Sequence, residues 1–99
     1  MRVISLQPLR EFWEQHPDAE LPLRHWYKVA IAAEWGSIAD VRRSYPHADS
    51  VSVDSGVLTV FNIGGNKYRL IARIRYDFSL INIRAVLTHD EYDRDRWKE

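Results

Sequence analysis

Residues 57–88, VLTVFNIGGNKYRLIARIRYDFSLINIRAVLT, decide the fold, because they contain three β-rich runs separated by two short turns. Strands are predicted over residues 57–63, 66–76 and 80–88. Two adjacent glycines between β-rich runs, Gly64 and Gly65, are typical of a hairpin. Asp77-Phe78-Ser79 forms the second predicted turn. The stretch therefore predicts a three-stranded antiparallel meander.

Upstream of this meander the hydrophobic period changes from strand-like to helical. Apolar and aromatic residues recur at spacings of three and four in two segments, which indicates two amphipathic helices: Leu9, Phe12, Trp13 and His16 in the first, and Leu23, Trp26, Tyr27, Ala30 and Ile31 in the second. Pro17 is expected to end the first helix and Asp18 to cap the second, which Gly36 ends. The two helices are expected to form an antiparallel pair.

Shorter elements complete the predicted order. Met1 to Ser5 reads as a short strand, Ser37 opens a third helical segment that Pro46 ends, and residues 49–55 are a weak strand or a loop. From His89 the chain continues as a short helix or an irregular tail. At 99 residues the chain is one domain, since two cores need more chain. The fold class is α+β, β-α-α-α-β-β-β, with two N-terminal helices packed on one face of a small antiparallel sheet.

Composition excludes several classes of function. The absence of cysteine excludes a disulfide scaffold and thiol catalysis. No apolar run approaches 18 residues, and the first residues lack the apolar stretch of a secretory signal, so we expect a cytoplasmic protein. The glycines do not form a phosphate-binding loop, and the four histidines lack metal-ligand spacing. We therefore expect no metal, no other cofactor and no membrane association.

Positive charge is concentrated in the predicted meander, although the net charge of the chain is zero. Residues 67–84 hold five cationic side chains and one acidic one. Alternation places Tyr68, Leu70, Ala72, Ile74 and Tyr76 on the core face of the middle strand, and Lys67, Arg69, Ile71, Arg73 and Arg75 on the other face. In the last strand Ile81, Ile83, Ala85 and Leu87 share one face, with Asn82, Arg84, Val86 and Thr88 opposite. Arg84 is thus expected beside Arg69 or Arg73 on a helix-free, basic face, unless these arginines merely point into water.

His89 follows directly after the last predicted strand, at the edge of this basic face. A histidine in such a place can accept and donate a proton near neutral pH. Tyr92 comes three residues later. The alternative is that residues 88–93 form a helix cap that carries an exposed histidine.

Several segments together resemble one protein family. These are residues 60–70 (VFNIGGNKYRL), Ile83-Arg84, residues 88–93 (THDEYD), Phe12-Trp13 with residues 16–19 (HPDA), Trp26-Tyr27, and residues 39–41 (ADV) leading to Pro46. The pattern is similar to HigB-type toxins of the RelE/ParE superfamily, and the similarity covers roughly residues 1–93.

The resemblance implies a RelE-like domain that acts as a metal-independent, ribosome-dependent mRNA endoribonuclease and uses the 2′-hydroxyl of the RNA. It also implies neutralisation by a HigA-type antitoxin with a helix-turn-helix. Arginine forks suit a phosphate whose negative charge builds during the reaction. On this basis the catalytic residues are expected to be Arg69, Arg84, His89 and Tyr92, with RNA binding by Asn66, Lys67 and Arg73.

Two other functions remain open. The same superfamily includes non-catalytic toxins of the ParE type, which act by binding gyrase and lack the catalytic set. The chain could instead be a partner-binding or RNA-binding module whose aromatic and arginine side chains serve contact alone. Cleavage of transcripts during translation separates the first function from both alternatives.

Overall fold

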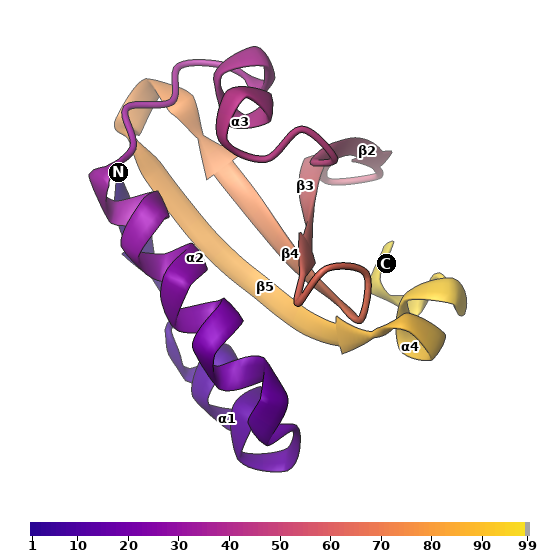
Figure 1. Ribbon diagram of the computed structural model, residues 1–99. Coiled ribbons are helices and arrows are strands. Elements are labelled where there is room, and N and C mark those ends of the chain that lie inside the picture. Colours follow the sequence, from indigo (N-terminus) through magenta and orange to yellow (C-terminus); the bar gives the residue numbers. More distant parts are fainter. Residues whose placement is uncertain (99) are drawn as a thin grey trace.

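The computed structural model of the protein describes residues 1–98 (Figure 1). Its helices are α1 (Gln7–Gln15), α2 (Glu20–Ala32), α3 (Ile38–Ser44) and α4 (His89–Asp93), with 3₁₀ turns η1 (Pro17–Ala19), η2 (Tyr76–Phe78) and η3 (Arg96–Lys98). Its strands are β1 (Arg2–Ile4), β2 (Asp49–Val53), β3 (Gly56–Ile63), β4 (Tyr68–Arg75) and β5 (Leu80–Thr88). The predicted α+β order is confirmed, and the polar segment after α3 is a strand.

The sheet has the order β1-β5-β4-β3-β2 and is mixed, not purely antiparallel as predicted. Strands β2 to β5 form an antiparallel meander, whereas β1 pairs in parallel with β5, with Val3 opposite Ile81. The hairpins fix the direction of β5, and β1 is separated from β5 by most of the chain. No local turn therefore constrains β1 to be antiparallel. The polar β2 lies at the other edge, and its alternating Val51 and Val53 give it one apolar face, which is sufficient for a strand in an antiparallel sheet.

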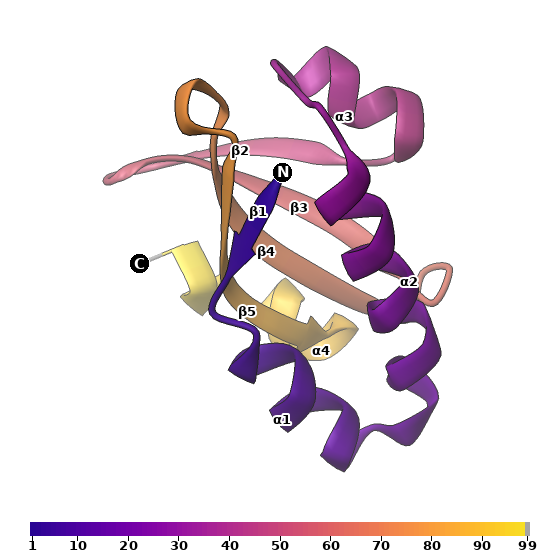
Figure 2. The ribbon, with the colours of Figure 1, turned by 90° about the vertical axis from the view of Figure 1, so that its left-hand side faces the viewer.

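Helices α1 and α2 form the predicted hairpin and lie on one side of the sheet (Figure 2). Leu23, Trp26 and Ala30 point into the core, and the Trp26 ring meets the Phe61 ring edge-to-face at 5.4 Å. Ile31, which the periodicity placed on this face, is exposed. The second helix also ends at Ala32, before Gly36. The main core therefore lies between this hairpin and the predicted apolar face of β4.

A β-bulge in β5 changes which residues face that core. Ile71 pairs with Ala85 and Ala72 pairs with Ile83, so Arg84 has no partner on β4. One extra residue reverses the alternation beyond it. Val86 consequently lies in the helix-side core, while Ala85 and Leu87 lie on the opposite face. The predicted alternation is correct before Arg84 and wrong after it.

The face opposite the helix hairpin is not free of helices, contrary to the sequence prediction. It holds a second apolar cluster of Leu58, Val60 and Ile71, with partly buried residues packed against it: Val51, Val53, Ala85, Leu87, Tyr92 and Trp97. Tyr92 and Trp97 belong to α4 and η3. The C-terminal segment thus folds over part of this face, because its two aromatic side chains can be buried there.

Candidate active site

Arg69 is the buried member of the predicted catalytic set. It lies in the middle of the sheet, opposite Asn62 of β3 and Leu87 of β5, and only 8% of it is exposed. Its Nη1 donates hydrogen bonds to the carbonyl oxygens of Asn66 (3.2 Å) and Tyr68 (3.1 Å), and its Nη2 donates to Asn66 Oδ1 (2.7 Å). Burying a cation is costly unless its donors are satisfied. Asn66, predicted to contact RNA, therefore holds this guanidinium in place.

The turn between β3 and β4 makes this contact possible. It spans residues 64–67, longer than the two-glycine turn predicted, and Gly64 and Gly65 have φ values of 64° and 70°. Such positive values favour glycine, which has no Cβ to clash with the backbone. The loop turns the Asn66 carbonyl and side-chain amide back toward Arg69.

Tyr92 lies against Arg69 from the C-terminal helix. The Arg69 guanidinium carbon is 5.4 Å from the centre of the Tyr92 ring, within the range of a cation–π contact. Trp97 stacks on Tyr92 with ring centres 5.0 Å apart, and its indole N–H donates to the Tyr92 carbonyl at 2.9 Å. Trp97 was not predicted as a site residue. The available signal was an isolated aromatic residue in a charged tail.

His89 is the first residue of α4. Thr88 caps the helix: its Oγ1 accepts from the Glu91 N–H (3.2 Å), and Glu91 Oε1 accepts from the Thr88 N–H (2.9 Å). His89 Nδ1 lies 3.0 Å from Asp93 Oδ2, with about half of each side chain exposed. When Nδ1 carries the proton and donates it to Asp93, Nε2 remains available to accept one. Residues 88–93 therefore form a capped helix, and the same helix holds the His89 imidazole in one orientation through Asp93.

Arg84 occupies the bulge of β5 and is exposed. Within residues 1–98 its side chain makes no hydrogen bond or ion pair. The paired residue nearest to it, Ile71, is two positions along β4 from Arg69, or roughly 7 Å at the usual strand rise. A bulge projects its extra residue out of the ladder. Arg84 is thus an exposed cation on the strand next to the buried Arg69, three residues from Leu87, the residue opposite Arg69.

The other predicted RNA contacts lie elsewhere. Lys67 belongs to the turn and not to the strand, and its ammonium group forms an ion pair with Asp18 of η1 at 2.9 Å. Arg73 donates to the carbonyl (2.8 Å) and the hydroxyl (2.7 Å) of Ser55, in the turn between β2 and β3. Neither side chain is brought together with Arg69.

Asp18 links the helix hairpin to the turn that carries Asn66. It does not cap α2 as predicted. Its carboxylate accepts from the Tyr68 hydroxyl (2.6 Å) as well as from Lys67. These hydrogen bonds, that of Tyr68 first, lower the pKa of Asp18 below its ordinary 3.8. The same contact with Asp18 raises the pKa of Tyr68 and that of Lys67. The cluster is therefore stable in the form with Asp18 ionised and Tyr68 neutral.

We expect Asp18→Asn to remove a contribution to the free energy of unfolding that depends on pH. Because the pKa of Asp18 is lower in the folded state than its ordinary 3.8, the ionised carboxylate stabilises the folded protein above pH 3.8. This stabilisation is lost as the pH falls through the pKa of Asp18 in the folded protein. The variant should unfold at lower urea than the parent at pH 6, and the difference should shrink below pH 3.8. Asp54→Asn, at an exposed turn position, is the matched control. A difference that is the same at both pH values contradicts this role for Asp18.

Among residues 1–98, no group of three or more His, Cys, Asp or Glu side chains could hold a metal ion. None of the helices in this part of the chain is long and apolar enough to cross a membrane.

Comparison with known proteins identifies the family. Residues 19–95 match the family model HigB_toxin, described as the RelE-like toxic component of a toxin–antitoxin system. The chain is 27% identical to the mRNA interferase HigB of Escherichia coli O6:H1, over 95% of this chain and 90% of the relative. It is also 27% identical to the mRNA interferase toxin HigB of Escherichia coli K12 and to the mRNA interferase HigB of Shigella flexneri, over 94% of this chain and 88% of each relative. Because the family model matches most of its length, this chain belongs to the HigB family of RelE-like toxins of toxin–antitoxin systems.

Proposed function

We propose that this toxin is a metal-independent endoribonuclease that cleaves mRNA on the ribosome and is neutralised by a HigA-type antitoxin with a helix-turn-helix. The observation that carries the proposal is the placement of three side chains along the second half of β5: the exposed Arg84 in its bulge, the buried Arg69 opposite Leu87, and His89, held by Asp93, directly after the strand. The relatives named mRNA interferases support the same reaction.

These residue types suit cleavage through the 2′-hydroxyl of the RNA. The 2′-oxygen forms a bond to phosphorus and loses a proton, the bond from phosphorus to the 5′-oxygen breaks, and the 5′-oxygen gains a proton. His89 carries out one of these proton transfers through Nε2, while Asp93 holds Nδ1. Arg84 and Arg69 offset the negative charge that builds on the phosphorane. Trp97 stacks on the Tyr92 ring and the Arg69 guanidinium lies over it, so base stacking on this ring is blocked and its hydroxyl is the group that positions the phosphate.

The charge of the chain supports a substrate delivered by the ribosome. Affinity for free RNA comes mainly from cationic side chains that neutralise phosphates. This chain has a formal net charge of zero, and Lys67 and Arg73 are engaged within the protein. Its own attraction for free RNA is correspondingly weak, and we expect cleavage to require the ribosome. The chain is expected to act in the cytoplasm, where translated mRNA is found.

The chemistry of the cut ends tests this function. With purified ribosomes and a translated reporter mRNA, the new 5′ ends should carry a hydroxyl and the new 3′ ends a 2′,3′-cyclic phosphate or a 3′-phosphate. Omitting the ribosomes is the control and should abolish cleavage. A 5′-phosphate end would indicate attack by an activated water and overturn the proposed mechanism. Growth arrest without any cleavage would favour a toxin of the non-catalytic ParE type.

A further inference from the structure

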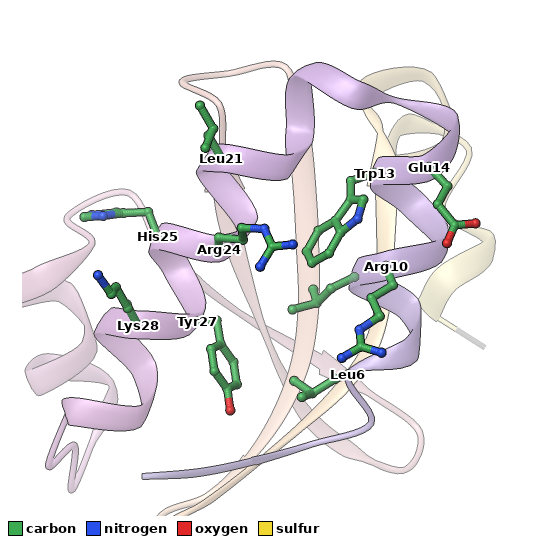
Figure 3. Close-up of a pocket in the computed structure, with 10 residues that line it drawn as sticks. Leu6, Arg10, Trp13, Glu14, Leu21, Arg24, His25, Tyr27 and Lys28 are labelled. Atoms are coloured by element: carbon green, nitrogen blue, oxygen red, sulfur yellow. The ribbon is translucent and has the colours of Figure 1, made fainter.

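A groove of about 710 Å³ lies between α1 and α2. Figure 3 shows the side chains that line it, with Trp13 of α1 and Arg24 of α2 facing each other across the opening. The Arg24 guanidinium carbon lies 4.7 Å from the centre of the Trp13 ring. The groove is thus formed by the helix hairpin, whereas Arg69 and Tyr92 lie on the other face of the sheet.

The lining of the groove is largely apolar and partly uncovered. Leu6, Trp13 and Tyr27 are half-buried along it, above the buried Leu9. Leu21 stands at its edge with 78% of its surface exposed. Removing exposed apolar surface from water is favourable, in proportion to the area that is buried. The parts of these side chains that remain exposed within residues 1–98 can therefore be buried by a partner, with a gain in free energy.

The charges around the groove indicate the character of that partner. Arg10, Arg24 and Lys28 are cationic, and Glu14 is the acidic member of the lining. Arg24 pairs with Glu20 at 2.7 Å, whereas Arg10 and Lys28 are exposed and form no ion pair within the described residues. Two unpaired cations beside an apolar floor complement a segment with an apolar face and acidic flanks.

We propose that this groove binds an amphipathic, acidic helix of the antitoxin. A helix whose apolar residues recur every three or four positions can place successive anchors against Leu21, Trp13 and Leu6, while its carboxylates meet Arg10 and Lys28. Binding here leaves the candidate active site on the opposite face uncovered. The proposal rests on the proposed function only in taking the partner to be the neutralising antitoxin.

The affinity of the purified antitoxin for groove variants tests the proposal. The double variant Leu21→Asn, Lys28→Glu alters two exposed positions, so folding should be preserved. Calorimetric titration should give a dissociation constant at least tenfold weaker than for the parent. The matched control Val57→Asn, Arg43→Glu changes an exposed apolar residue and an exposed cation away from the groove. It should bind within about twofold of the parent.

Other outcomes identify other occupants. Unchanged antitoxin affinity in the groove variant overturns the proposal. A weaker affinity of the same variant for a short single-stranded RNA, with antitoxin binding intact, also overturns it and assigns the groove to RNA. In cells, the groove variant should still arrest growth, and the antitoxin should no longer restore it. If neither the parent nor the variant cleaves mRNA, the proposed function is wrong. The calorimetric comparison then still shows whether the groove binds the antitoxin.

Discussion

Arg84→Ala should reduce the rate of ribosome-dependent mRNA cleavage by about 10²–10³ and relieve growth arrest. Loss of one donor that stabilises the charge of a transition state typically has an effect of this size. The side chain is exposed at a bulge and makes no hydrogen bond or ion pair within residues 1–98, so its removal should leave the thermal midpoint unchanged. Single-turnover cleavage of a translated reporter measures the effect.

Two comparisons make this result specific. Arg75→Ala removes an exposed arginine from the end of β4, where it pairs with Asp77 at 3.5 Å, and should change the rate little. Arg84→Lys retains the charge but loses the fork that binds two phosphate oxygens, so we expect partial activity. A folded Arg84→Ala protein that cleaves at the parent rate shows that this residue is wrongly assigned.

Arg69 is expected to behave differently from Arg84. Sequence alternation alone suggests that either arginine can be removed without harm to the fold. However, the Arg69 guanidinium makes three hydrogen bonds and contacts the Tyr92 ring, and 8% of the residue is exposed. Its loss should lower both the cleavage rate and the thermal midpoint. Arg84 therefore gives the cleaner test of catalysis.

His89→Gln should slow cleavage at neutral pH by at least tenfold, within the range of about 10²–10⁴ typical for losing a general acid or base. Glutamine retains hydrogen bonding and approximate volume but cannot transfer the proton. The capping box of Thr88 and Glu91 does not involve the imidazole, so α4 should remain folded. The variant should bind the antitoxin and the ribosome as the parent does, which separates chemistry from binding.

Asp93→Asn and Tyr92→Phe complete this test. Asparagine at position 93 keeps a hydrogen bond to His89 but removes the carboxylate that orients it, so the rate should fall by less than in His89→Gln. Tyr92→Phe retains the ring that stacks on Trp97. A parent-like rate for His89→Gln, with a large loss for Tyr92→Phe, would transfer the proton-transfer role to Tyr92 and leave His89 as an exposed residue in the first turn of α4.

The sequence by itself determined the kinds of element and the region of the candidate site. The helical period in the first half and the strand alternation in the second depend on residues that are close together in the chain, so the sequence pattern predicts both. It also placed Arg69 opposite the helix-side core, and it placed His89 immediately after the last strand. These features follow from local spacing, which tertiary contacts did not override.

Only the tertiary structure decided how the charged side chains are used. The bulge at Arg84, the ion pair between Lys67 and Asp18, and the packing of Trp97 on Tyr92 are set by register or by burial. A periodic pattern contains no signal for one extra residue in a ladder, because each side of the bulge alternates normally. The contact between Lys67 and Asp18 joins residues 49 positions apart. Such a contact depends on how helix and sheet pack together, and local sequence does not encode it.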